Sequence, residues 1–90
     1  MAQTTAWGLI ETRGLTGLVE ACDAMAKTAY VSIGTARSVE AGLISVVIRG
    51  EVGAVQVALD AGAAAAQRVG ELHSAHVIPR PEQRLETLLD

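Results

Sequence analysis

The segment that most constrains the fold is the apolar run at residues 43–49, which leads directly into an alanine-rich stretch at 51–69. The run reads LISVVIR, and its length and β-branched residues predict a buried strand. In the stretch that follows, apolar residues recur at spacings of three and four, which predicts an amphipathic helix. A strand and a helix joined this closely indicate a layered domain in which the helix covers the sheet.

The helix expected at 51–69 has small residues on several faces, because Ala64 and Ala65 lie outside its apolar stripe. Small side chains allow a neighbouring element to approach closely. Glu51 stands in the first turn, where the helix dipole favours an anion. Gly70 stands just after the end, where a left-handed cap is commonly needed. Glu51 and Gly70 therefore support a helix that begins at about residue 51 and ends at about residue 69.

The segments before this unit predict a helix and a hairpin. Residues 15–29 carry apolar side chains at the spacing of one helical face. Residues 30–36 form a weaker apolar run, close enough to 43–49 to predict an antiparallel hairpin. The tight turn between these two strands is expected at SVEAG, residues 38–42.

Two further strands are expected at 6–12 and 72–78, and a short amphipathic helix at about 82–89, with its leucines facing inward. The order is therefore β-α-β-β-α-β with an added terminal helix, an α+β fold of the ferredoxin-like type. The pattern R-G-x-x-G-x-V occurs at 13–19 and again at 49–55, each time where a strand meets a helix. This repeat supports a fold with two pseudo-symmetric halves.

The size of the chain predicts a single domain over residues 1–90, with its core at about 6–80. Such a chain buries only about 60% of its extended surface on folding. Half of the residues are apolar, yet Trp7 and Tyr30 are the only aromatic side chains. Abundant small apolar surface suits flat contact between chains, so we expect an obligate oligomer. The net charge of −3 argues against a nucleic-acid partner.

The sequence predicts a cytoplasmic protein without a membrane partner. One cysteine, Cys22, cannot form an intramolecular disulfide, which suits a reducing compartment. The first residues, MAQTTAWG, lack the basic and apolar regions of a signal peptide. Gln56, Asp60 and Gln67 interrupt the most apolar region, so no segment reaches the length of a membrane span.

Candidate catalytic and metal-binding groups are few. His73 and His76 lie three residues apart on one expected strand, so they point to opposite faces and cannot chelate one ion together. Cys22 falls on an apolar helical stripe, which is typical of an inert thiol. Glu20 and Asp23 share one side of that helix, with no second polar cluster to orient a substrate. We therefore expect no catalytic residue, no metal site and no cofactor.

Two cations stand out by their positions. Arg80 lies between Pro79 and Pro81, which restrict the backbone on both sides and hold the guanidinium stiffly. Such a group is well placed to meet carbonyls or carboxylates of a neighbouring molecule. Lys27, the only lysine, lies near the end of the first expected helix, where a cation stabilises the helix dipole.

Several longer stretches together resemble one family. GLIETRGL, EACDAMAK, VIRGEVGAVQVALDAGAAAAQRVGEL and HVIPRP are similar, in order and spacing, to motifs of bacterial microcompartment shell proteins with one such domain per chain. The resemblance runs from about Ala6 to Leu89. It implies a structural protein and not an enzyme: a flat homohexamer that tiles, with other shell proteins, into the microcompartment shell around encapsulated enzymes.

The resemblance also implies roles for particular residues. Lys27, in the DAMxK motif, and Arg80, in the PRP motif, correspond to family positions at the edge where hexamers meet. The turn between the second and third strands corresponds to the lining of a pore for small metabolites on the symmetry axis. In this chain the pore-lining residues are then Ser38, Val39, Glu40, Ala41 and Gly42.

This turn departs from the family pattern. Close relatives often carry Ile-Gly-Ser-Gly, whereas this chain has Val39, Glu40, Ala41 and Gly42. A ring of Glu40 carboxylates predicts a pore that disfavours small anions.

The alternative function is a ferredoxin-like regulatory module that binds a small metabolite between chains. Such a module would be a dimer or trimer with a ligand cleft.

Overall fold

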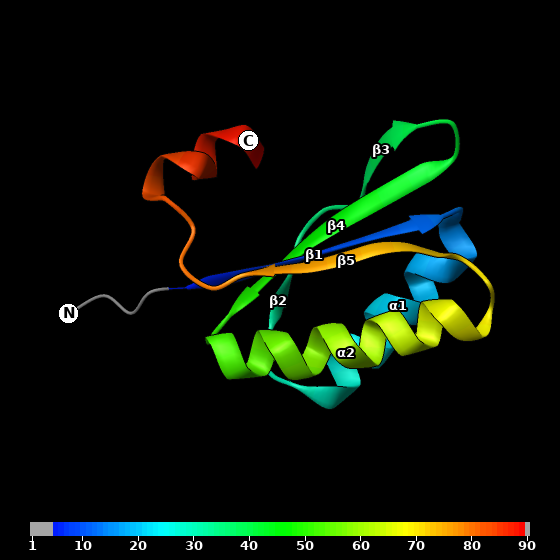
Figure 1. The fold of residues 1–90 in the computed structure, drawn as a ribbon, viewed down its shortest axis with the longest axis horizontal. Coiled ribbons are helices and arrows are strands. Elements are labelled where there is room, and N and C mark those ends of the chain that lie inside the picture. The colour runs from blue at the N-terminus through cyan, green and yellow to red at the C-terminus, as the bar shows by residue number, and fades with distance from the viewer. Residues whose placement is uncertain (1–4, 90) are drawn as a thin grey trace.

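A computed structural model describes residues 5–89 of the chain. Figure 1 shows a layered arrangement, with two α-helices against one face of a sheet and a C-terminal 3-10 helix on the opposite side. The elements in chain order are β1 (Ala6–Arg13), α1 (Leu15–Thr28), β2 (Ser32–Ile33), β3 (Arg37–Glu40), β4 (Leu43–Gly50), α2 (Val52–Arg68), β5 (Leu72–Ile78) and η1 (Gln83–Leu89).

The sheet has the strand order β2-β4-β1-β5, and β3 pairs with β4 beside this path. All these pairs are antiparallel, and the β1–β4 register runs from Ala6 opposite Gly50 to Arg13 opposite Leu43. Each helix returns the chain across the sheet, so β1 and β2 run in the same direction with β4 between them. The ferredoxin-like α+β arrangement predicted from the sequence is confirmed.

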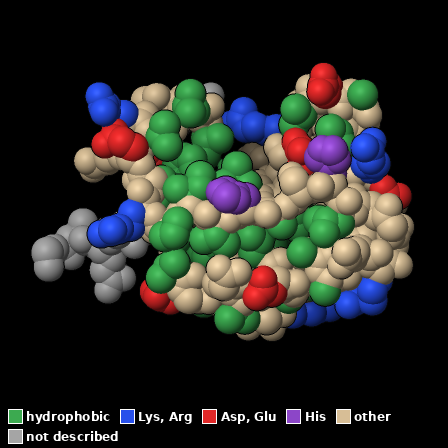
Figure 2. Space-filling view, viewed as in Figure 1, with side chains coloured by type: hydrophobic (Ala, Val, Ile, Leu, Met, Phe, Trp, Pro, Cys, Tyr) green, Lys and Arg blue, Asp and Glu red, His purple; other side chains and the backbone are tan. Residues whose placement is uncertain are grey.

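The core lies between the sheet and the two helices. Alternate residues of the central strands point toward the helices, so Ala6 and Ile10 of β1 and Val46 and Ile48 of β4 are buried. In the space-filling view, hydrophobic side chains form a band between α2 and the strands (Figure 2). The buried residues contributed by the helices to this cluster are Leu18, Ala21, Met25, Val55, Ala58, Leu59 and Ala66.

Gly62 permits the close approach of α1 and α2. A Cβ atom at this position would lie 2.6 Å from Cγ and 2.8 Å from Sδ of Met25, and 3.4 Å from the Ala21 carbonyl oxygen. Met25 is fully buried, so its side chain has little room to move. The close contact expected from the small residues of 51–69 is therefore found between the two helices.

The expected strand at 30–36 is wrong in its extent. Only Ser32 and Ile33 pair with β4 there, and a separate strand, β3, occupies residues expected to be a turn. The chain is drawn against β4 at Gly34, whose N–H donates to the Val47 carbonyl at 2.9 Å. A Cβ atom at Gly34 would lie 3.0 Å from that same oxygen. The ladder with β4 stops after Ile33 and resumes at Arg37, so the second strand of the fold consists of two short pieces.

The C-terminal helix also differs from expectation. It is a 3-10 helix, in which residues three apart lie on the same side. Glu86 and Leu89 therefore lie on one side and both line a hollow against the sheet. Of the three leucines expected to face inward, Leu85 and Leu89 are half-buried, whereas Leu88 is 72% exposed.

The ends of α2 follow the signals in the sequence. Glu51 is the N-cap residue, and its carboxylate accepts a hydrogen bond from the Ala54 N–H at 3.1 Å. Gly70 follows the helix with a φ of 70°, a left-handed conformation that glycine adopts without strain.

On α1 the predicted apolar face is only partly covered, because Leu15 is 61% and Val19 57% exposed.

We predict that Gly62→Ala lowers the free energy of unfolding by about 1–3 kcal/mol, because the added methyl group overpacks the contact with Met25. In a Met25→Ala background the same substitution should be neutral or stabilising, since the methyl group then has room and alanine favours the helix. Urea denaturation followed by circular dichroism measures both changes. Equal losses in the two backgrounds would contradict the role assigned to Met25.

Candidate functional site

The five residues expected to line a pore lie on the β3–β4 hairpin. Ser38, Val39 and Glu40 belong to β3, and every residue of this strand is exposed. The hairpin is paired through Ser38 opposite Ile44 and Glu40 opposite Leu43, with a shift in register between these pairs. The connecting turn therefore consists of only two residues, and most of the expected turn is strand.

The two turn residues, Ala41 and Gly42, both have positive φ angles, 43° and 82°. Positive φ at both positions is the requirement of a type I′ hairpin turn, in which Asn-Gly is the favoured pair. Alanine in the left-handed region costs roughly 1–2 kcal/mol. The Gly42 carbonyl accepts a hydrogen bond from the Gly14 N–H at 2.8 Å, which ties the turn to the junction of β1 and α1.

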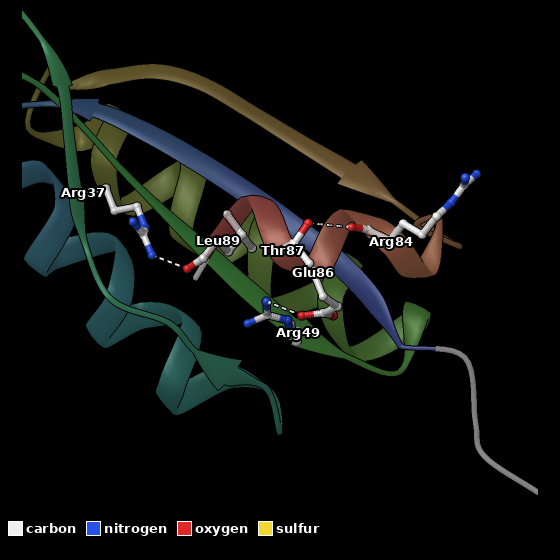
Figure 3. A network of polar contacts seen from close by, with 6 residues as sticks. All are labelled: Arg37, Arg49, Arg84, Glu86, Thr87 and Leu89. Atoms are coloured by element: carbon white, nitrogen blue, oxygen red, sulfur yellow. Dashed lines mark hydrogen bonds and ion pairs between the residues drawn. The ribbon is translucent and has the colours of Figure 1, made fainter.

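The charges of the hairpin are directed apart. The Arg37 guanidinium donates to the carbonyl oxygen of Leu89 in η1, as Figure 3 shows. Glu40 is exposed, and among residues 5–89 its carboxylate makes no side-chain hydrogen bond and no ion pair. Arg37 and Glu40 therefore do not pair with each other.

Lys27 lies in the last turn of α1, where it complements the helix dipole. Its Nζ atom lies 2.8 Å from a carboxylate oxygen of Asp23, and both side chains are largely exposed. The hydrogen bond and charge of Asp23 raise the pKa of Lys27 above its usual value. The lysine is therefore a fixed positive charge on the surface at any physiological pH.

Arg80 is exposed in the bend between β5 and η1, and Pro79 and Pro81 flank it as the sequence indicates. The side chains of Lys27 and Arg80 are both cationic donors, so they cannot bind each other directly. The two residues lie on different elements, α1 and the segment after β5. The structure does not join them in one local site.

Groups with possible chemistry outside these segments are weakly organised. Nε2 of His73 lies 3.6 Å from Glu11 Oε1, and the Ser74 hydroxyl donates to the same oxygen at 3.4 Å. Among residues 5–89, no group of three or more His, Cys, Asp and Glu side chains is arranged to hold a metal ion. Burial raises the pKa of the Cys22 thiol, so the reactive thiolate is disfavoured at neutral pH.

One arrangement was not predicted from the sequence. Arg49 of β4 lies over the Trp7 ring, with its guanidinium carbon 5.1 Å from the ring centroid. Its Nη2 atom donates to a Glu86 oxygen at 3.0 Å (Figure 3). The sequence contained one indication of this arrangement, an arginine in an otherwise apolar strand. A half-buried charge needs a partner, so such a residue predicts an ion pair. The partner comes from η1, which is remote in the sequence.

The fold defines a small α+β domain, and its candidate charged residues lie on an exposed hairpin and on two separate exposed segments. None of the helices in residues 5–89 is long and apolar enough to cross a membrane. The family model for the BMC domain matches residues 6–81. The chain therefore belongs to the BMC domain family of bacterial microcompartment shell proteins.

Individual relatives agree with this assignment. The chain is 51% identical over 87 residues to the bacterial microcompartment shell protein PduA of Salmonella typhimurium, covering 97% of this chain and 93% of the relative. It is 56% identical over 81 residues to the shell protein EutM of Escherichia coli, covering 90% and 84%. The carboxysome shell protein CsoS1A of Hydrogenovibrio crunogenus is 48% identical over 85 residues, covering 93% and 88%.

A solved structure supports the fold independently. A microcompartment protein from Desulfitobacterium hafniense superimposes with a TM-score of 0.84 and 31% identity over 97% of this chain. The chain spans about half of that protein, 49% of its length. These comparisons support a structural role in a shell and do not favour a metabolite-binding regulatory module.

We predict that Ala41→Asn stabilises the protein by about 1 kcal/mol, because asparagine tolerates the left-handed conformation better than alanine. Gly42→Ala should destabilise it by a similar amount through backbone strain alone, since nothing lies within 4 Å of the added Cβ atom. Thermal unfolding measures the two shifts. A shift of Tm in the same direction for both variants would contradict the type I′ turn.

Proposed function

We propose that the chain forms a flat homohexamer, and that its β3–β4 hairpins surround a central pore for small metabolites. The observation that carries this proposal is the hairpin itself. All four residues of β3 are exposed, and β3 lies at the margin of the sheet, where it pairs only with β4 (Figure 1). Its side chains are therefore available to neighbouring copies. Ser38, Val39, Glu40, Ala41 and Gly42 would line the opening.

The surface of the single chain supports assembly. Large apolar side chains are exposed on both helices and on the segment that follows α1, which is typical of surfaces that meet a partner. Strand β5 forms an edge of the described sheet, and an uncovered edge favours contact with another chain. The exposed residues that support this contact are Leu15, Val19, Tyr30, Val52, Val57 and Val69.

Lys27 and Arg80 form the proposed edge at which hexamers meet. Both are exposed cations on separate segments, and Arg80 is held by prolines on either side. A stiff guanidinium loses little conformational freedom when it binds carbonyl or carboxylate oxygens of the adjacent tile. Through this edge the chain would join further copies and other shell proteins around the enclosed enzymes.

We expect Arg80→Ala to leave the hexamer intact and to weaken the formation of extended sheets, because Arg80 acts between hexamers in this proposal. Light scattering gives the mass of the discrete particle, and electron microscopy shows sheets or tubes. The matched control is Arg84→Ala. This change removes an exposed arginine of η1 that pairs with Glu82, the residue just before the helix. This control should assemble as the unmodified protein does.

Two outcomes would contradict the assembly proposal. Loss of the hexamer in Arg80→Ala would mean that Arg80 acts within the ring and not between rings. An unmodified protein that remains a dimer at high concentration would exclude the hexamer itself.

The chemistry of the proposed pore follows from Glu40. In a ring, the copies of this carboxylate would lie within about a Debye length of each other, about 8 Å at physiological ionic strength. The Arg37 guanidinium donates to η1, and among the described residues it makes no ion pair with Glu40. The pore should therefore disfavour small anions and admit neutral or cationic metabolites.

We predict that Glu40→Gln removes this preference, so that small anions and cations of similar size cross assembled shells at similar rates. Exchange of charged reporter molecules into loaded shells measures both rates. The control is Glu20→Gln, the same change of charge at an exposed position on α1. Unchanged ion preference in Glu40→Gln, or an equal loss in the control, would exclude the charged pore.

A further inference from the structure

A hollow of about 470 Å³ lies between η1 and the face of the sheet opposite the α-helices. Its volume is in the range of sites for small organic molecules. Leu9 and Val47 give it an apolar floor, and Arg37, Arg49 and Glu86 supply the charged groups of its lining. Figure 2 shows a notch between the hairpin and the C-terminal helix, with basic side chains at its rim. The lining therefore combines an apolar surface with two cations and one anion.

Both arginines of the hollow already hold oxygen acceptors. Arg37 donates to the Leu89 carbonyl, and Arg49 donates to Glu86 (Figure 3). The Nε atom of Arg49 is buried and has no acceptor among the described residues. The Trp7 ring supports this guanidinium from one side, which restricts its orientation. The hollow thus has two oriented guanidinium groups with hydrogen-bonding capacity left over.

The helix η1, which supplies both acceptors, is held only weakly against the sheet. This helix has no buried residue, and Leu88 points into solvent. Its ion pair with Arg49 is partly exposed, and exposed pairs of this kind contribute little to stability. A ligand that offers stronger acceptors can therefore replace η1 at the two arginines.

We propose that this hollow binds short-chain dicarboxylates. One carboxylate would take the place of Glu86 on Arg49, and the other would take the place of the Leu89 carbonyl on Arg37. The guanidinium fork matches a carboxylate with two parallel hydrogen bonds, which exceed a single bond to a carbonyl. The apolar floor of Leu9 and Val47 accommodates the methylene groups between the two ends.

The two acceptors support a ligand with two anionic ends. Glu86 and Leu89 place one oxygen on each arginine, and both arginines line the same hollow. A linear diacid can offer one carboxylate to each guanidinium. A guanidinium binds phosphate as well as carboxylate, so it is the apolar floor of the hollow that favours a diacid over inorganic phosphate. This site is separate from the proposed pore, since Glu40 does not line it.

The test is a titration of the assembled, full-length protein with succinate. Trp7 is the only tryptophan and lies against Arg49, so its fluorescence reports occupancy, with calorimetry as a second measurement. Arg37→Gln should weaken succinate binding by at least about tenfold, because it removes one charge-assisted pair. Glu86→Gln should strengthen binding several-fold, because it removes the carboxylate that competes for Arg49.

The matched control is Arg84→Gln, which makes the same charge change on η1 outside the hollow, and it should bind succinate as the unmodified protein does. Equal weakening by Arg84→Gln and Arg37→Gln would reduce the effect to general surface charge and overturn the site. Butyrate or inorganic phosphate binding as tightly as succinate would overturn the two-ended ligand. Absence of saturable binding by calorimetry would overturn the proposal as a whole.

Discussion

The structure depends on the pairing of β4. This strand pairs with β1 along its length on one side, and with β2 and then β3 on the other. Val46 and Ile48 point toward the helices, whereas Arg49 points toward η1. A slip of one residue would exchange these faces and bury the arginine in the core. The register of one apolar strand therefore holds the core, the hairpin and the hollow in place.

Several large apolar side chains of the chain are exposed on its surface. Small residues on α1 and α2 make a thin core, because the contact at Gly62 brings the helices close together. Large apolar side chains such as Leu15 and Val19 are exposed. In the proposed assembly these side chains would gain further burial against neighbouring copies. The family assignment and the physical character of the surface lead to the same structural role.

The separation of charge on β3 links the hairpin to the C-terminal helix. Arg37 points to η1, and Glu40 stands at the tip of the strand. A nearby arginine in the sequence suggests compensation of the carboxylate, but a strand directs each side chain by its place in the pleat and its register. The Glu40 carboxylate at the hairpin tip therefore has no ion-pair partner among the described residues, whereas the Arg37 guanidinium lines the hollow.

The sequence by itself determined the two helices, the main strands, their order and the α+β class, because period and end signals are local properties of the chain. It also placed Glu51 and Gly70 at the ends of α2 correctly. Tertiary contact decided the division of the second strand after Ile33, the two-residue turn, and the partners of Arg37 and Arg49. These features depend on segments far apart in the sequence, whose distance and orientation are set only when the sheet and η1 come together.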